Sequence, residues 1–231
     1  MSKANLILLH GALGSQAQMQ DFKACLQDDF AVYDLNFEGH GGRKSEAKFS
    51  IERFAQNILA LMAEKSIDQS HLFGYSMGGY VALYLAKTQP ERVGRIATYA
   101  TKFHWTPEVA AKEVKMLNPE IIEQKVPRFA QQLAQTHQPT DWKEVLHKTA
   151  GMMQELGEGK GLQEQDLQQI SHRVLINVGD QDKMVGMEES KTAAQALPNG
   201  AWNILKDFVH PFDRIDVQKL SVEVRQFLQM P

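Results

Sequence analysis

Short apolar runs alternate along the chain with stretches of helical periodicity, and this alternation limits the fold more than any other feature. Six runs are rich in β-branched or aromatic residues and are mostly apolar on both faces, at 5–9, 31–35, 71–74, 95–99, 173–178 and 202–207. Helical patterns lie at 16–27, 50–65, 77–87, 188–196 and 217–228. Strands of this kind, separated by helices, are typical of a parallel sheet covered on both faces. We expect an α/β fold with a doubly wound, about six-stranded, all-parallel sheet.

One segment breaks this alternation. Between residues 102 and 171 no run fits a strand, whereas apolar residues recur there at helical spacing. Thr106-Pro107 and Asn118-Pro119 fit helix starts with proline at the first helical position, and Thr140-Asp141 fits another cap. A segment of about 70 residues is too long for a simple crossover between strands. We therefore expect a core at 1–101 and 172–231 and a helical cap, or lid, at 102–171.

The composition is that of a globular protein and gives no indication of a nucleic-acid or metal partner. Hydrophobic residues make up 43% and charged residues 23% of the 231 residues, and the net charge is −3. There is thus no basic excess of the kind expected for nucleic-acid binding, and no His, Cys and carboxylate cluster suggests a metal. The early apolar run has five residues, too few for a signal sequence or a membrane span. We expect a cytoplasmic monomer or homodimer that acts on a small molecule, without cofactor, metal, nucleic acid or membrane.

Polar or glycine-bearing stretches follow five of the six expected strands. They read HGALGS at 10–15, NFEGHGG at 36–42, GYSMGG at 74–79, GDQDKMV at 179–185 and DFVHPF at 207–212. Parallel strands end at one edge of their sheet, where ligands of such folds bind. The stretches therefore predict one site at this edge.

Ser76 stands in a Gly-x-Ser-x-Gly pattern between an apolar strand and an apolar helix. In a sharp strand-to-helix turn, glycines two positions away avoid clashes and the hydroxyl projects at the helix N-terminus. The backbone N–H of Met77 would there face a developing oxyanion. The alternative is a tight turn with a serine helix cap and no chemistry.

A serine nucleophile needs a base, and the base needs an orienting acid. His210 and Asp182 follow Ser76 in the chain, each just after an expected strand. His104 is the rival base, while Asp180, which we expect to hold its turn, and Asp207 are rival acids. The other histidines have structural interpretations: hydrogen bonding in turns for His10 and His40, a place at the wrong sheet edge for His71, and solvated or capping roles for His137, His147 and His172.

The chain resembles the α/β-hydrolase superfamily over essentially its whole length. The matching residues are His10-Gly11-Ala12-Leu13-Gly14-Ser15, Asp34 to Gly41, Gly74-Tyr75-Ser76-Met77-Gly78-Gly79, Gly179-Asp180-Gln181-Asp182 and His210. The resemblance implies Ser76 as nucleophile, His210 as general base and Asp182 as its orienting acid. It also implies an oxyanion hole formed by the backbone N–H groups of Ala12 and Met77.

Two departures from the family pattern stand out. The family usually opens with a pair of strands before the His-Gly turn, but the first strand here begins at residue 5, which reduces the sheet to about six strands. The turn after Gly39-His40-Gly41 is one or two residues longer than usual. It contains Arg43, which we interpret as a solvated loop residue in preference to a partner for a substrate anion.

The expected activity is that of a serine hydrolase that cleaves a carboxylic ester through an acyl-enzyme. Methionines and aromatic residues in the helical segment predict an apolar, adaptable pocket, so the substrate is expected to be small or medium and largely apolar. The candidate substrate-binding residues are Leu13, Tyr75, Phe103, His104, Trp105 and Trp142.

Two alternatives stay open. The first is a lyase or carbon–carbon bond hydrolase resembling the menaquinone-pathway synthase, which carries a similar Gly-Tyr-Ser-Met-Gly-Gly elbow. Those relatives have an arginine after the elbow glycines, whereas Tyr80 stands here, which favours the esterase. The second is a ligand-sensing relative of the hydrolases that does not turn over.

Overall fold

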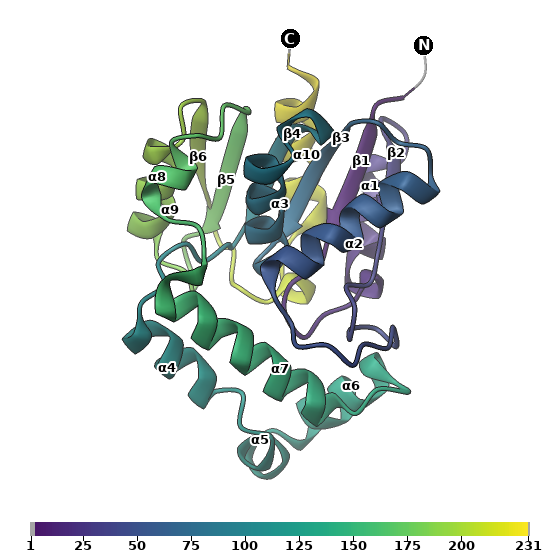
Figure 1. The fold of residues 1–231 in the computed structure, drawn as a ribbon. Coiled ribbons are helices and arrows are strands. Elements are labelled where there is room, and N and C mark those ends of the chain that lie inside the picture. The colour runs from purple at the N-terminus through teal and green to yellow at the C-terminus, as the bar shows by residue number, and fades with distance from the viewer. Residues whose placement is uncertain (1–2, 231) are drawn as a thin grey trace.

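A parallel sheet forms the centre of the protein. The computed structural model describes residues 3–230, and within them the strands lie in the order β2-β1-β3-β4-β5-β6, every neighbouring pair parallel (Figure 1). This confirms the expected six-stranded, all-parallel sheet. The strands are β1 (Asn5–Leu9), β2 (Ala31–Asp34), β3 (Ser70–Tyr75), β4 (Val93–Tyr99), β5 (Val174–Gly179) and β6 (Gly200–Leu205).

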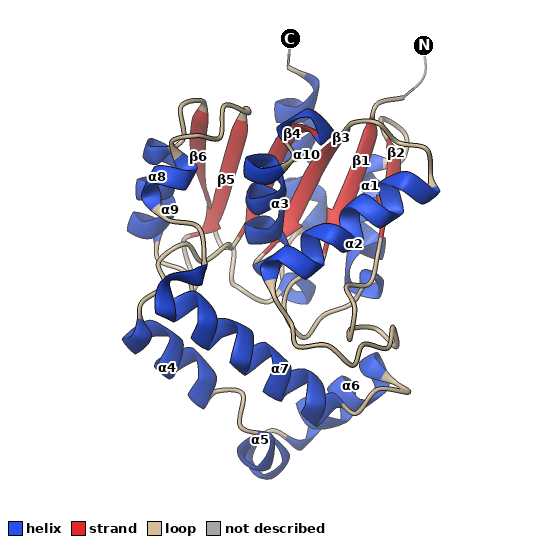
Figure 2. Ribbon diagram, viewed as in Figure 1, coloured by secondary structure: helices blue, strands red, loops and turns tan. Residues whose placement is uncertain are grey.

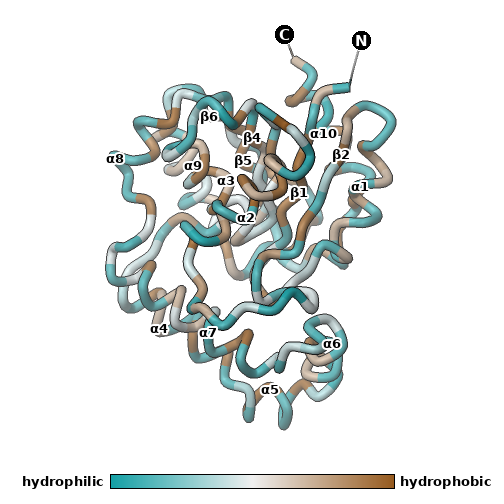
Figure 3. Tube along the Cα trace, turned by 45° about the vertical axis from the view of Figure 1, so that its right-hand side comes forward, coloured by the Kyte–Doolittle hydropathy of each residue, from teal (hydrophilic) through white to brown (hydrophobic). Residues whose placement is uncertain are grey.

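Helices cover the sheet on both faces, as expected for a doubly wound fold (Figure 2). One face carries α2 (Ile51–Glu64), α3 (Met77–Thr88) and α9 (Met187–Ala196), and the other carries α1 (Gln20–Leu26) and α10 (Val217–Gln229). Each face has its own buried apolar cluster, and Figure 3 shows hydrophobic residues concentrated along the central strands. No described helix combines the length and apolar character needed to cross a membrane.

The first helix of the α2–α3 face illustrates why these residues fold as they do. Ser50 caps α2, since its side chain accepts a hydrogen bond from the backbone N–H of Arg53, and this satisfies one otherwise unpaired donor. Phe54, Ile58 and Met62 recur at helical spacing and are fully buried. Local capping and one apolar stripe thus place α2 against the sheet.

The edge strand β6 departs from the expectation that each strand is covered on both faces. Trp202 and Ile204 in β6 keep 36% and 43% of their surface exposed. β6 has a neighbour on one side alone, β5, and the reason for the exposure is this edge position. An apolar run in the sequence does not reveal whether its strand lies at the centre or the edge of the sheet.

The segment between β4 and β5 is helical and lies beyond the carboxyl ends of the strands (Figure 1). Thr106, Asn118 and Asp141 cap three of its helices through their side chains, in agreement with the starts expected from the sequence. Its division from the core at residues 102 and 171 stays a prediction. The helices are α4 (Pro107–Lys115), α5 (Pro119–Lys125), α6 (Pro127–His137), α7 (Trp142–Glu155) and α8 (Glu164–Leu167).

Candidate active site

Ser76 is the single residue between β3 and α3, and its backbone is strained. Its φ of 50° and ψ of −117° lie in a region that residues with a side chain rarely adopt. Two of its hydrogen bonds join it to β4 and the residues after it: its N–H donates to the carbonyl of Tyr99 at 2.8 Å, and the hydroxyl of Thr101 donates to its carbonyl at 3.0 Å. The neighbouring strand β4 and the residues after it thus stabilise the turn.

The glycines on either side of Ser76 are required by close packing. A Cβ atom on Gly74 would lie 2.3 Å from the backbone nitrogen of Gly79, and one on Gly78 would lie 2.4 Å from the carbonyl oxygen of Leu9. Both contacts are with backbone atoms and are too short for any side chain. The two glycines of the Gly-x-Ser-x-Gly pattern are therefore needed because α3 begins in close contact with β3 and β1.

His210 and Asp182 come from the loops after β6 and β5 and meet in a hydrogen bond. The Nδ1 atom of His210 lies 2.9 Å from Oδ2 of Asp182. The other carboxylate oxygen, Oδ1, accepts the backbone N–H groups of Met184 at 2.8 Å and Val185 at 2.9 Å. An ionised carboxylate only accepts hydrogen bonds, so Nδ1 carries the proton and Nε2 of the neutral ring is a free base.

The Asp182 carboxylate is held ionised. Its side chain is fully buried, and that of His210 is 12% exposed. Burial acts to raise the pKa of Asp182, but the hydrogen bond and charge interaction with His210 and the two backbone N–H groups outweigh it and lower this pKa below its ordinary value. The arrangement stabilises a positive charge on His210 should Nε2 take up a proton.

The rival acids have other partners. The Asp180 carboxylate accepts the backbone N–H of Asp207 at 2.7 Å and so ties the loop after β5 to the loop after β6. The Asp207 side chain accepts from the amide of Gln181 at 3.1 Å. Of the three aspartates weighed from the sequence, Asp182 is the one bonded to His210.

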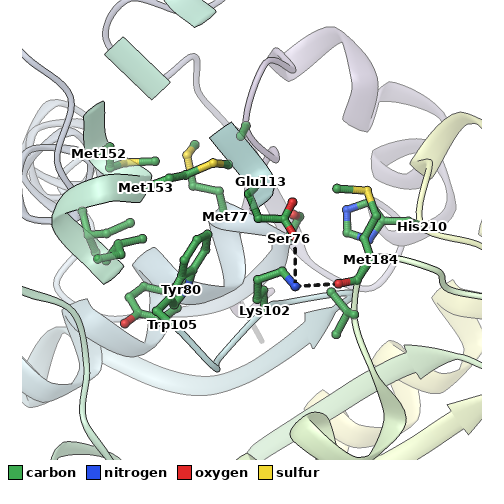
Figure 4. Close-up of a pocket in the computed structure, with 14 residues that line it drawn as sticks. Ser76, Met77, Tyr80, Lys102, Trp105, Glu113, Met152, Met153, Met184 and His210 are labelled. Atoms are coloured by element: carbon green, nitrogen blue, oxygen red, sulfur yellow. Dashed lines mark hydrogen bonds and ion pairs between the residues drawn. The ribbon is translucent and has the colours of Figure 1, made fainter. Parts of the chain in front are cut away.

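Ser76 and His210 line one pocket between the carboxyl ends of the strands and the helical segment. Figure 4 shows Met152, Met153, Trp105 and Tyr80 on one side and His210 with Met184 on the other. Tyr80 is buried, and its hydroxyl accepts the backbone N–H of Leu162 at 2.6 Å. The pocket is lined by Ala12, Ile51, Ser76, Met77, Tyr80, Lys102, Trp105, Glu113, Met152, Met153, Leu156, Met184, Val185 and His210.

A lysine and a glutamate form an ion pair in the wall of this pocket. Nζ of Lys102 lies 3.3 Å from Oε1 of Glu113 and donates to the carbonyl of Met184 at 2.6 Å (Figure 4). Nearby, burial raises the pKa of Glu189 to about 7. This pair was not predicted from the sequence, since nothing in the spacing of Lys102 and Glu113 indicates that they are neighbours.

Ala12 and Met77, whose backbone N–H groups were expected to form an oxyanion hole, both line this pocket. Neither group donates a hydrogen bond to any acceptor within residues 3–230. Both residues line the pocket beside Ser76, and Met77 is the first residue of α3, where backbone N–H groups have no partner within the helix. Two backbone N–H groups without a hydrogen-bond acceptor in the described part of the chain thus belong to residues that line the pocket with Ser76.

Of the six side chains expected to bind substrate, Trp105 alone is among those that line this pocket in the described part of the chain. His104 is exposed at the surface, so it does not fit the expectation of a pocket residue or a rival base. Trp142 packs in a cluster between α5, α6 and α7, and Phe103 packs on the main core. Leu13 contacts these two clusters.

Tyr75 packs against His210 and is not among the described residues that line the pocket. Its ring centre is 5.6 Å from that of His210 and 5.0 Å from that of Phe212. Arg43, the unusual residue of the longer turn, donates to the carbonyl of Asn36 at 3.0 Å, and its own carbonyl accepts the N–H of Gly39. Tyr75 thus packs against the ring of His210. Arg43 stabilises its own turn through these two hydrogen bonds.

His137 differs from the solvated or capping role expected of it. It is fully buried at the end of α6, because α6 folds back over the loops after β1 and β2.

Among residues 3–230, no group of three His, Cys, Asp or Glu side chains has an arrangement that could hold a metal ion.

Comparisons with known proteins agree with this fold. A sequence model described as alpha/beta hydrolase fold matches residues 4–149, more than half of the chain. An enol-lactonase from Burkholderia xenovorans LB400 superposes with a TM-score of 0.81 at 18% identity, over 100% of this chain and 93% of that one.

Two curated relatives have different activities. A pimeloyl-[acyl-carrier protein] methyl ester esterase of Vibrio parahaemolyticus serotype O3:K6 is 30% identical over 112 residues, 47% of this chain and 40% of the esterase. A 2-hydroxymuconate semialdehyde hydrolase of Pseudomonas putida is 23% identical over 217 residues, 82% of this chain and 73% of that one. The chain spans 40 to 59% of the length of the curated methyl ester esterases compared with it.

The family match over residues 4–149, together with the parallel sheet and the strained turn at Ser76, identifies the protein as a member of the alpha/beta hydrolase fold family.

Proposed function

We propose that the protein is a serine esterase that cleaves a carboxylic ester through an acyl-enzyme. One observation carries the proposal: a strained serine at a helix N-terminus shares a pocket with a histidine whose far nitrogen is bonded to a buried carboxylate. Ser76 is the proposed nucleophile, His210 the general base and Asp182 the acid that orients it. This is the arrangement by which a hydroxyl is activated near neutral pH.

The proposed reaction has two halves. Nε2 of His210 takes the proton of the Ser76 hydroxyl as its oxygen bonds to the acyl carbon, and the N–H groups of Ala12 and Met77 stabilise the oxyanion. The bond to the leaving oxygen then breaks, and His210 protonates the alcohol that departs. Water repeats the sequence on the acyl-enzyme, with His210 as base, and releases the acid and free Ser76.

The lining of the pocket supports a largely apolar, uncharged acyl group. Methionines supply much of it, and their flexible side chains adapt to the shape of a ligand. The charges of Lys102 and Glu113 balance each other within their ion pair. The methyl ester esterases among the relatives support an ester as the substrate class, and this pocket argues for a small or medium apolar acyl chain.

The second candidate is a carbon–carbon bond hydrolase or lyase that uses the same three residues. The alignment with 2-hydroxymuconate semialdehyde hydrolase, which covers 82% of the chain, supports it. Tyr80 argues against it, because its hydroxyl is engaged by Leu162 and it offers no cation at a position where relatives of the menaquinone-pathway synthase have arginine. The ester substrate is therefore preferred.

Short p-nitrophenyl esters and a fluorophosphonate probe test the proposal. The wild type should hydrolyse the esters and take up the probe, and Ser76→Ala should lose labelling and reduce kcat by on the order of 10⁶. Ser171→Ala, which alters an exposed serine, is the matched control and should behave as wild type.

Other outcomes separate the alternatives. An unlabelled wild type that leaves every ester intact would overturn the esterase. Cleavage of a vinylogous 1,5-diketone in its place would favour the carbon–carbon hydrolase. Thermal stabilisation by a ligand that is never converted would favour a sensor.

A further inference from the structure

Three buried histidines meet where the helical segment contacts the core. His10, His40 and His137 are fully buried. The ring centres of His10 and His40 lie 5.2 Å apart, and those of His40 and His137 lie 5.7 Å apart. The first two belong to the loops that follow β1 and β2, and His137 ends α6. The reaction proposed above uses none of these three side chains.

His137 bridges two loops of the core with its two ring nitrogens. Nε2 lies 3.1 Å from the carbonyl oxygen of Leu13, and Nδ1 lies 3.2 Å from the backbone nitrogen of Gly41. A carbonyl only accepts and a backbone N–H only donates, so these partners set a neutral ring with its proton on Nε2. One side chain of α6 thus contacts residues 124 and 96 positions away in the chain.

The Leu13 contact falls on the turn that presents the N–H of Ala12. In this turn the N–H of Gly14 donates to the carbonyl of Gly11 at 3.2 Å. Leu13 has a φ of +60°, the left-handed region that a leucine adopts only when its surroundings hold it there. The hydrogen bond from His137 acts on the carbonyl of this strained residue, one position after the proposed oxyanion donor.

A second side chain, that of Asn36, also holds the loop that contains Gly41. The side chain of Asn36 donates to the carbonyl of Gly41 at 3.0 Å and accepts the N–H of Gln16 at 2.7 Å. The loops after β1 and β2 are thus joined to each other by Asn36 and to α6 by His137. A shift of α6 would move the carbonyl of Leu13 and change the direction of the Ala12 N–H.

We propose that His137 is a positioning residue, which holds the Ala12 N–H in the oxyanion site through its bond to Leu13 and makes that site depend on a docked α6. The inference rests on the proposed function, because it deepens the role assigned to Ala12. His137 touches neither the substrate nor Ser76.

Two amide substitutions separate the two contacts of the ring. A glutamine amide reaches the place of Nε2 and can still donate to Leu13, whereas an asparagine amide reaches that of Nδ1 and can still accept from Gly41. We expect His137→Asn and His137→Ala to lower kcat for p-nitrophenyl esters by about 10- to 100-fold with KM changed less than about threefold. His137→Gln should stay within about threefold of wild type, and His147→Ala, at an exposed histidine of α7, should leave both constants unchanged.

Hydrogen exchange measured by mass spectrometry supplies a readout that does not need turnover. Exchange of residues 11–16 should accelerate in His137→Asn and His137→Ala and stay as in wild type in His137→Gln. Equal loss of kcat in the asparagine and glutamine variants, or unchanged exchange in all three, would overturn the role of His137. If no ester is cleaved and Ser76 is not labelled, the proposed function fails, and the exchange rates alone then decide whether His137 holds this turn.

Discussion

Asp182 and Asp180 stand two positions apart, yet their carboxylates have different partners. Oδ1 of Asp182 is bonded to two backbone N–H groups, and Oδ2 faces Nδ1 of His210. Asp180 accepts a single backbone N–H, that of Asp207. The consequence of replacing each carboxylate with an amide follows from these partners.

Asp182→Asn is expected to lower kcat for esters by on the order of 10⁴. The asparagine oxygen would keep the N–H bonds of Met184 and Val185, so its NH₂ group would face His210. Nδ1 would then have to accept, the proton would move to Nε2, and the base would be lost. In Asp180→Asn the amide oxygen still accepts from Asp207, so this matched variant should keep kcat within a few-fold. Steady-state kinetics with p-nitrophenyl esters decides, and the reverse order would mean that Asp180 is the orienting acid.

At the scale of elements, α4 is joined to the core by a charged contact in the pocket wall. The Glu113 side chain is 8% exposed and that of Lys102 is 16% exposed. Lys102 follows β4, while Glu113 lies on α4, so the pair links the helical segment to the sheet. A charge buried to this extent is costly without its partner.

Lys102→Met is expected to lower the free energy of unfolding by about 3 kcal/mol, because it leaves Glu113 buried without its partner. Glu113→Gln should cost less, since the amide oxygen still accepts from Lys102. The double variant with methionine at both positions should recover to within about 1 kcal/mol of wild type, because no charge is then buried alone.

Urea unfolding measures each of these changes, with Lys115→Met, an exposed lysine of α4, as the control. A loss in Lys102→Met no larger than in this control would contradict a stabilising contact. A double variant less stable than both single variants would contradict the argument from an unpaired charge.

At the scale of the whole molecule, the three buried histidines couple folding to pH. Burial lowers the pKa of His10 to about 4, lowers that of His40 well below its ordinary value, and lowers that of His137. An unfolded histidine titrates near 6.5. Between these pKa values the three histidines bind more protons in the unfolded chain than in the folded one, so their contribution to stability falls as the pH falls. Glu189, whose pKa burial raises to about 7, contributes in the opposite direction.

We expect stability to decline as the pH drops from about 7.5 to 5, with His10 alone contributing about 2 kcal/mol over this range. Urea unfolding at these two pH values measures the decline. His10→Gln should show a smaller decline than wild type, whatever its stability at pH 7.5, because it removes one titrating group. His147→Gln, at an exposed histidine, should decline as wild type does, and an equal decline in His10→Gln would refute the assignment.

Much of the fold and the core of the candidate site could be predicted from local sequence. The apolar runs predicted all six strands to within two residues at each end, since the central strands are buried on both faces and need uninterrupted apolar residues. Gly74 flanks Ser76 because α3 begins against its own strand, a packing requirement within the motif, whereas Gly78 is required by the approach of β1 at Leu9. The parallel direction of the strands then predicted that the loops with Asp182 and His210 would end beside Ser76.

Only the tertiary structure decided which side chains form the pocket and hold its loops. Lys102 and Glu113 form an ion pair that the pattern of residues between them does not predict. Trp142 packs between helices and is not part of the pocket. His137 is joined to Leu13 across 124 residues, so its surroundings could not be read from its neighbours in sequence. The spacing of apolar residues indicates which side chains are buried, and a glycine indicates where another part of the chain approaches the backbone closely. The partner of a polar side chain depends instead on how distant segments come together in space.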